Sequence, residues 1–321
     1  MKNKIENFLQ EFSDTPSQID GDFTVYTLND TKGMGKGTMH VIELLDGIFL
    51  SYNDLVMSSC SNEHFPDFPY IGINHCKEGT YEVILPNEKA CFMQKGDIAI
   101  NYHKKTAAYD SRLPSKMYKG LTLMFDEEKA ERSLKIMAPY LNFTLSSFIT
   151  TTLKGKGVSL MHRNVNSEEI LSVMYSDEAK RSKVFLISKM IELLIYLNEN
   201  YVDNSADMLL FSPSVVARTR EACSYLAQNL EKKVTSAFLA KHFRLAETSL
   251  RECFKAMYGM PVATYQRALK INRAEEILKT EQNCQIGELS QLLGYENQSK
   301  FASAFRSQTG ISPIEYRNKH L

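Results

Sequence analysis

The chain has 321 residues, 43% of them hydrophobic and 24% charged, an ordinary composition for a globular protein and a length that favours two domains. No apolar run approaches the roughly 18 residues of a membrane-spanning helix, which argues against a membrane protein. The formal net charge is zero, but residues 212–321 hold 16 Lys and Arg against 10 Asp and Glu, a net of +6, which leaves −6 for residues 1–211. This asymmetry indicates a phosphate-binding module joined to a part that stays off nucleic acid, with a chance distribution of surface charge as the alternative.

The six cysteines form no CxxC pair and no spacing typical of a zinc site. This pattern predicts free thiols in a reducing compartment. The N-terminal segment is polar and amphipathic and does not have the charged-then-apolar order of a leader peptide. We therefore expect a cytoplasmic protein that makes no membrane contact.

Residues 22–125 are predicted to be mostly strands. Short segments rich in β-branched and aromatic residues alternate with Gly, Asp, Asn and Pro, a pattern typical of a barrel or a double sheet. The Gly-rich residues 33–37 lack the strand and the Gly-Lys-Ser/Thr of a phosphate loop, so we interpret them as a flexible hairpin. The predicted strands are residues 23–28, 39–45, 70–76, 80–85, 98–102 and 119–125.

Five of the seven histidines precede residue 170, namely His40, His64, His75, His103 and His162. A metal-dependent barrel enzyme needs an H-x-H pair, a Glu and a later His, so that three or four ligands converge. The chain contains no H-x-H. We therefore predict no metal site, no cofactor and no catalytic residue.

The pattern becomes helical after Asp126. Residues 127–137 and 168–175 are predicted helices, and residues 177–200 form a long third one. The apolar stripe of the third helix is wider than one exposed face, which favours packing against its own barrel.

A linker over residues 204–214 separates two predicted domains. Ser212 as N-cap with Pro213 at the first helical position is a recognisable helix start, and the helix is expected to run to about Leu230. The first domain is predicted over residues 1–203, with its barrel at about 22–125 and its helices at about 126–200. The second domain is predicted over residues 215–321.

The second domain contains the same helical pattern twice, at an offset of 51 residues. Each copy has a short apolar helix, a tight turn and a helix with a polar and an apolar face, predicted at residues 235–243 and 247–257 and again at 286–293 and 298–308. Such a unit is a helix-turn-helix, whose second helix enters the DNA major groove, so the repeat predicts binding to double-stranded DNA. A helix at residues 262–280 is expected to fix the separation of the two copies. The offset aligns Phe238 with Leu289, Leu250 with Phe301, Phe254 with Phe305, Gly259 with Gly310 and Tyr265 with Tyr316.

Residues 286–317 resemble the DNA-binding domain of the AraC/XylS family of bacterial transcription regulators. In the first copy, Phe243-Arg244 replaces the Gly-containing turn. The resemblance extends over about a third of the chain, from residue 215 to residue 317. It rests on the Gly294-Tyr295 turn, the Phe301 and Phe305 pair, and the ending Gly310-x-Ser312-Pro313-x-x-Tyr316-Arg317.

This resemblance implies an α+β two-domain fold, in which an N-terminal cupin-like β-barrel with a helical hairpin precedes an all-α domain of two helix-turn-helix units joined by a linker helix. It implies a DNA-binding transcription regulator, most often an activator, that works with RNA polymerase and responds to a small-molecule effector in the barrel. Family members commonly pair through helices in the position that residues 177–200 occupy in this chain. The resemblance therefore makes the apolar stripe of this helix a candidate homodimer seam. The stripe consists of Val184, Ile187, Ile191, Leu194 and Ile195.

DNA contacts are expected on the outer faces of the two recognition helices, with a solvated helix face as the alternative for each residue. Arg and Lys recognise guanine and Gln recognises adenine through major-groove edges, whereas contacts to phosphates position the protein without specifying sequence. The predicted base contacts are Thr248, Ser249 and Arg251 in the first copy, and Gln298, Ser299, Lys300 and Ser303 in the second. The predicted phosphate contacts are Lys241, Arg244, Lys255 and Arg306.

The barrel is also similar in layout to the siderophore-responsive, pyochelin- and yersiniabactin-type branch of the family. A siderophore is therefore one candidate effector, beside a sugar, a fatty acid or another metabolite. A regulator without a ligand or controlled by a protein, and an enzyme barrel tethered to DNA, are the competing hypotheses, and the missing metal ligands argue against the enzyme. Ligand contacts inside the barrel are predicted at His75, Tyr81, Tyr102 and His103, with core packing as the alternative for each.

Overall fold

The computed structural model describes residues 4–13, 17–29, 35–57, 59–60, 68–84, 88–103, 111–203, 209–281 and 284–320. The chain divides into two compact units, Met1–Leu210 and Phe211–Leu321, each of which is described by itself. Within the described ranges, no helix combines the length and the apolar character that crossing a membrane requires. His64 and the first part of the predicted Gly-rich hairpin lie outside these ranges.

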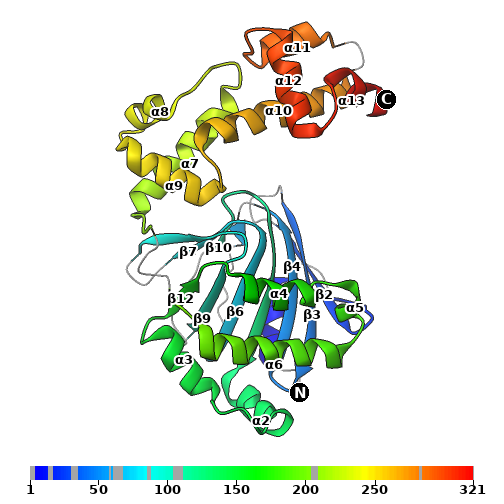
Figure 1. Ribbon diagram of the computed structural model, residues 1–321, viewed down its shortest axis with the longest axis vertical. Coiled ribbons are helices and arrows are strands. Elements are labelled where there is room, and N and C mark those ends of the chain that lie inside the picture. The colour runs from blue at the N-terminus through cyan, green and yellow to red at the C-terminus, as the bar shows by residue number, and fades with distance from the viewer. Residues whose placement is uncertain are drawn as a thin grey trace. The chain divides into compact units, whose positions relative to one another are not determined.

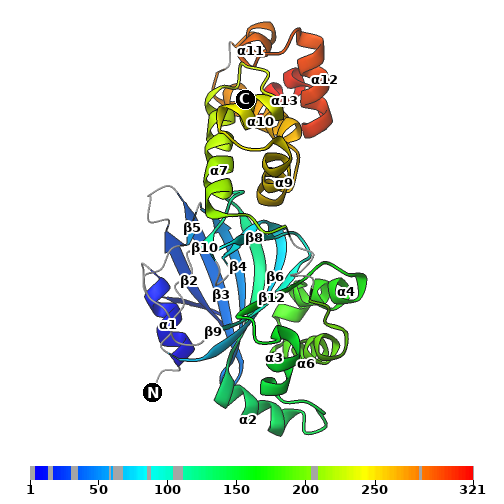
Figure 2. The same ribbon diagram turned by 90° about the vertical axis from the view of Figure 1, so that its left-hand side faces the viewer.

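The N-terminal unit is built on two antiparallel sheets (Figures 1 and 2). The order of the large sheet is β1 (Gln18–Asp20), β2 (Phe23–Asn29), β3 (Lys36–Leu45), β4 (Ile48–Val56), β11 (Tyr118–Asp126), β6 (Tyr70–Gly79), β9 (Ile98–His103) and β12 (Val158–Met161). The order of the small sheet is β5 (Ser59–Cys60), β10 (Ser111–Arg112), β7 (Tyr81–Ile84) and β8 (Ala90–Met93).

The α+β composition is confirmed, but a closed barrel is not. In the described residues, β1 and β12 are the outer strands of the large sheet and do not pair with each other. The six predicted strands all form, with ends shifted by a few residues. Strand β4 was not predicted, because its first four residues are buried on both faces and its last part is rich in Ser, Asn and Asp, so the sequence lacks a clean alternation.

Helices cover one face of the large sheet (Figure 1). The predicted helix over residues 177–200 is interrupted, because the Ser182 side chain accepts a hydrogen bond from the backbone N–H of Phe185 and so begins a new helix. The other face of the sheet meets the short helix α1 (Lys4–Phe12), which buries Ile5 and Leu9. The covering helices are α2 (Glu127–Met137), α3 (Leu145–Leu153), α4 (Val165–Met174), α5 (Asp177–Lys180) and α6 (Lys183–Asn200).

The apolar stripe of α6 is divided between two environments. Ile187 and Leu194 are buried in the core of their own unit, and Ile191 is half-buried against that core. Val184 is 75% exposed and Ile195 is 38% exposed. The helix therefore packs on its own sheet. A homodimer seam stays a prediction, and only the exposed residues of the stripe are free to form it.

Helices make up the described core of the C-terminal unit. The helix α7 (Pro213–Gln228) begins as predicted, with the Ser212 side chain accepting from the Val215 N–H and Pro213 in the first turn. The helix predicted between the two copies forms as α10 (Val262–Thr280), and α13 (Pro313–His320) closes the unit. The first copy consists of α8 (Ser236–His242) and α9 (Glu247–Tyr258), and the second of α11 (Ile286–Leu292) and α12 (Gln298–Thr309).

Candidate nucleic-acid interface

The two helix-turn-helix copies are in register, but with two different offsets. The second helices start 51 residues apart, after the N-cap residues Ala246 and Asn297. The first helices start only 50 residues apart, after Thr235 and Gln285. The turn of the second copy is therefore one residue longer.

This difference corrects one pair of the predicted alignment. Leu239 and not Phe238 is the counterpart of Leu289, because Leu239 is fully buried while Phe238 is 44% exposed. The backbone agrees, since Phe243 N–H donates to Leu239 O and Leu293 N–H donates to Leu289 O. The other aligned apolar pairs stand, and the four core residues Leu250, Phe254, Phe301 and Phe305 are fully buried.

The turn of each copy contains a residue with positive φ, but the residue differs between the copies. Arg244 in the first copy and Gly294 in the second both have positive φ, +53° and +67°. Arg244 is exposed, and the Arg218 guanidinium donates to its carbonyl at 2.8 Å. A Cβ on Gly294 would lie 1.8 Å from the carbonyl oxygen of Glu231, so only glycine fits there.

The outer face of α9 carries the predicted reading residues of the first copy. Thr248 and Arg251 are exposed and Ser249 is half-buried. The Arg251 guanidinium forms an ion pair with Glu247, one turn earlier on the same helix. The α9 face therefore presents a cation whose direction is already restrained.

The outer face of α12 carries the corresponding residues of the second copy. The Asn297 side chain accepts from the Lys300 N–H at 2.9 Å and caps the helix, and Asn is among the residues that N-cap positions favour. An ion pair between Lys300 and Glu296 lowers the pKa of the Glu296 carboxyl. The predicted reading residues Gln298, Ser299, Lys300 and Ser303 are all exposed.

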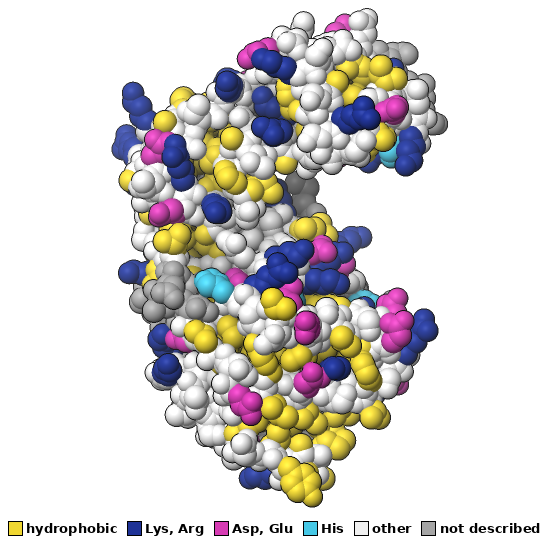
Figure 3. All heavy atoms as spheres, in the orientation of Figure 1, with side chains coloured by type: hydrophobic (Ala, Val, Ile, Leu, Met, Phe, Trp, Pro, Cys, Tyr) yellow, Lys and Arg dark blue, Asp and Glu magenta, His cyan; other side chains and the backbone are white. Residues whose placement is uncertain are grey.

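The predicted phosphate contacts lie beside these faces. All four cations, Lys241, Arg244, Lys255 and Arg306, have exposed side chains. Lys and Arg side chains are visible on the drawn face of the C-terminal unit in Figure 3. Each stays a predicted contact.

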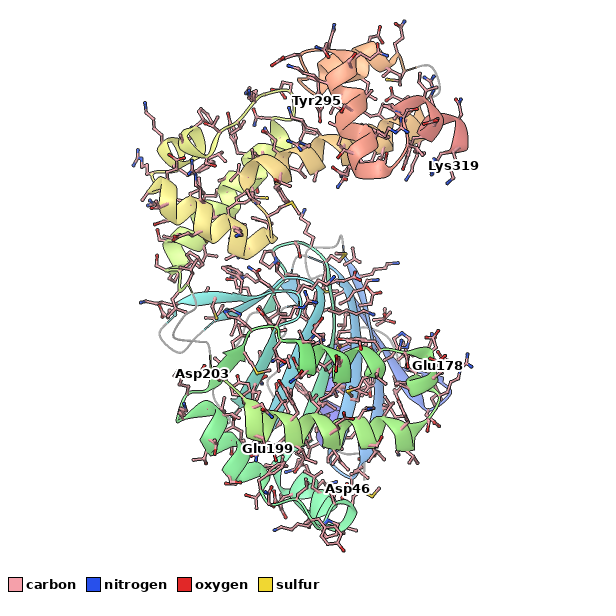
Figure 4. All side chains as sticks on the ribbon, in the orientation of Figure 1. Asp46, Glu178, Glu199, Asp203, Tyr295 and Lys319 are labelled. Atoms are coloured by element: carbon pink, nitrogen blue, oxygen red, sulfur yellow. The ribbon has the colours of Figure 1, made fainter. Side chains whose placement is uncertain are left out.

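The helix α10 and the loop before α8 connect the two copies. The Gln266 side chain on α10 donates to the Lys232 carbonyl at 2.9 Å, from the loop that also meets Gly294. Lys270 is buried beside Tyr295, with its ammonium 5.5 Å from the ring centroid, and burial lowers its pKa (Figure 4 labels Tyr295). Both recognition helices pack against α10, which links α9 to α12.

Of the predicted ligand contacts, the three whose side chains the structure describes do not share one face of the sheet. His75 and Tyr102 project toward the helix-covered face, where His75 hydrogen-bonds Tyr175 and Glu168 and Tyr102 donates to Glu127 at 2.6 Å. Tyr81 packs against a separate core on the other face, and the structure describes only the backbone of His103, opposite Tyr70. A shared ligand role for these four residues stays a prediction.

Sequence comparison gives the fold of the C-terminal unit a class. A family model described as a helix-turn-helix domain matches residues 239–319. The probable transcriptional regulator LumQ of Photobacterium leiognathi is 24% identical over 176 residues, or 54% of this chain and 68% of LumQ. The arabinose operon regulatory protein of Escherichia coli is 29% identical over 33% of this chain and 36% of that protein. The transcriptional activator RhaR of Pectobacterium carotovorum subsp. carotovorum is 35% identical over 26% of this chain and 29% of that protein.

Two solved structures illustrate the range of similarity. An AraC-type transcriptional regulator from Chromobacterium violaceum is 24% identical, covers 32% of this chain and 92% of its own, and has a TM-score of 0.31. Wild-type ToxT from Vibrio cholerae, bound to an unsaturated fatty acid, is 17% identical, covers 84% of this chain and 94% of its own, and has a TM-score of 0.31.

The C-terminal unit contains a helix-turn-helix domain over residues 239–319. This domain is similar to the one in AraC-type regulators, such as the arabinose operon regulatory protein. These relatives are regulatory proteins, two of them named as regulators of transcription. The chain spans about a third of the length of most of them, so its activity as a whole protein is a matter for proposal.

Proposed function

We propose that the protein is a sequence-specific transcription regulator, acting as an activator, that reads DNA with α9 and α12 together. The observation that carries the proposal is the pair of exposed recognition faces on one packed unit, which is also the basic part of the chain. Two helices fixed in this way suit successive major-groove segments about 34 Å apart on one DNA face.

A protection footprint on the DNA upstream of its own gene tests the proposal. The expected result is a pair of protected major-groove segments about one helical turn apart, weakened by salt. Protection of a single segment would contradict the joint reading by α9 and α12. Equal protection of all sequences would contradict sequence-specific binding.

A small-molecule effector in the N-terminal unit is the second part of the proposal. A row of polar side chains crosses the face of the large sheet opposite the helices α2 to α6. Asn53 donates to Thr122 at 3.0 Å, Thr122 donates to Asn74 at 2.9 Å, and Asn74 donates to Asn101 at 2.6 Å. All four side chains are half-buried. They share one face of the sheet because side chains alternate along a strand, and their neighbours Ile73 and Ile100 face the helices.

Such a row supports recognition of a neutral, hydroxyl-rich or amide-bearing molecule, since amide side chains both donate and accept. Repeating the footprint with cell extract tests effector control. Effector control is supported if extract changes the footprint of the unaltered protein and does not change the footprint of the Asn74→Leu variant. An unchanged footprint would favour a regulator without a ligand.

A further inference from the structure

The helix-covered face of the large sheet is left open beside α5, where a groove of about 660 Å³ lies. Its walls come from the strands β1, β2, β3, β4, β6 and β11, from Tyr175 at the end of α4, and from α5 with the residue after it. A groove of this size suits a small organic molecule. Tyr52 and Lys77 place the groove on the helix-covered face, whereas Thr122, Asn74 and Asn101 of the polar row do not line it; Asn53 belongs to the row and also lines the groove.

Three aromatic rings form one wall of the groove. The ring centroids of Phe23 and Tyr52 are 6.0 Å apart, and those of Tyr52 and Tyr175 are 5.9 Å apart. Both hydroxyls are engaged, since Tyr52 donates to the Met174 carbonyl at 2.5 Å and Tyr175 hydrogen-bonds the His75 Nδ1 at 2.9 Å. These bonds hold the two tyrosine rings in place.

Three cations line the groove with these rings. The Lys77 ammonium lies 4.4 Å from the Tyr175 ring centroid, and the Lys180 ammonium lies 5.0 Å from that of Tyr52. Arg181 lines the same groove. In the part of the chain that the structure describes, none of the three pairs with a carboxylate, whereas the nearby Lys119 pairs with Asp54 at 3.0 Å. Lys and Arg side chains gather on this face of the unit in Figure 3.

The opposite rim has the reverse polarity. Asp20 and Asp22 flank Gly21 in the turn between β1 and β2, and Thr38 and His40 lie on the neighbouring strand. These groups can accept hydrogen bonds from hydroxyl or amino groups. A ligand that fills the groove therefore meets positive charge at one end, aromatic faces in the middle and acceptors at the other end.

We propose that this groove binds a phosphomonoester that carries a planar ring, the chemistry of a nucleoside monophosphate. A phosphate dianion satisfies several unpaired cations at once, which a single carboxylate does less well. The ring stacks on Tyr52 and Phe23, and its hydroxyl and amino groups meet the acidic rim. The site is independent of the DNA-reading helices.

Calorimetric titration of the full-length chain with AMP, adenosine and inorganic phosphate tests the proposal. AMP should bind, and adenosine and phosphate alone should each bind about tenfold more weakly or worse, since each makes only half of the contacts. Absence of AMP binding at millimolar concentration would overturn the proposal. Phosphate binding as tightly as AMP would overturn the role of the ring.

Variants locate the site. Lys77→Ala combined with Lys180→Ala should weaken AMP binding by about tenfold or more, and the exposed Arg181→Ala should act in the same direction without risk to the fold. Lys183→Ala, two residues after Arg181 but outside the groove, should bind AMP as the unaltered protein does. A normal footprint in all variants would show that the proposed DNA function is intact. Unchanged AMP binding in the lysine and arginine variants would place any AMP site elsewhere and refute the assignment.

Discussion

Arg251 forms an ion pair with Glu247 on the exposed face of α9, and its side chain is 64% exposed. An exposed pair of this kind adds little to stability, so its main effect is to restrict where the guanidinium points. If Arg251 reads a base, Arg251→Ala should weaken specific binding by about 1–3 kcal/mol and relax the preference at one base pair. Binding measured on specific and random DNA checks this.

The control for Arg251 is Arg132→Ala on α2. Arg132 pairs with Glu128 at the same i,i+4 spacing, and its side chain is 61% exposed, but it lies in the other unit. It should leave both affinities unchanged. An equal loss on specific and random DNA for Arg251→Ala would assign Arg251 to the phosphates.

His75 is a buried histidine whose protonation should destabilise the N-terminal unit. Burial lowers its pKa, although the nearby Glu168 opposes the shift. Because the folded pKa lies below the unfolded value of about 6.5, the unfolded state binds more protons as the pH falls below that value. The free energy of unfolding should therefore decrease from about pH 6.5 toward the folded pKa, by at most about 1.4 kcal/mol per pH unit.

Denaturant unfolding at several pH values measures this slope. His75→Gln should reduce it, while His40→Gln, on the same face of the sheet, should not. An identical slope in His75→Gln and the unaltered protein would mean that other groups carry the pH dependence.

The turn of the second helix-turn-helix is the element most sensitive to a single methyl group. Gly294→Ala would place its Cβ against the Glu231 carbonyl in a residue with positive φ, whereas a Cβ on Gly310, at φ +84°, meets nothing within 4 Å. Gly310→Ala should therefore cost only the left-handed backbone term, about 1–2 kcal/mol. Gly294→Ala should cost more, since the backbone must also move, and thermal unfolding of the two variants compares them. Equal destabilisation would show that the turn yields to the methyl group.

The same turn shows what the sequence could reveal at the level of elements. The offset of 51 residues correctly aligned the recognition helices, because Phe254 and Phe305 are large and unambiguous core residues. It misaligned the first helices by one position, because Phe238 and Leu239 are both apolar and only burial distinguishes them.

In the N-terminal unit, the predicted ligand contacts were single histidines and tyrosines on strands. The alternation of side chains along those strands also places the half-buried asparagines between the apolar positions, and the prediction did not include them. The open edges of the large sheet could not be foreseen, because strand order depends on pairing between segments far apart in the chain.

At the scale of the whole molecule, the charge asymmetry between the two units should appear in the salt dependence of DNA binding. Each phosphate contact releases counterions, so the logarithm of the binding constant falls with the logarithm of salt concentration by about 0.9 per contact. Lys255 on α9 and Arg306 on α12 are exposed cations of the two recognition helices. Replacing both with Ala should reduce the magnitude of the slope by about 1.8 and weaken specific and random DNA alike. Replacing Lys135 and Arg132, two exposed cations on α2 of the acidic unit, should leave the slope unchanged, because that unit is expected to stay off the phosphates. A slope that falls equally in both double variants would mean that the net charge of the chain, and not contact at the helix-turn-helix units, governs its attraction to DNA.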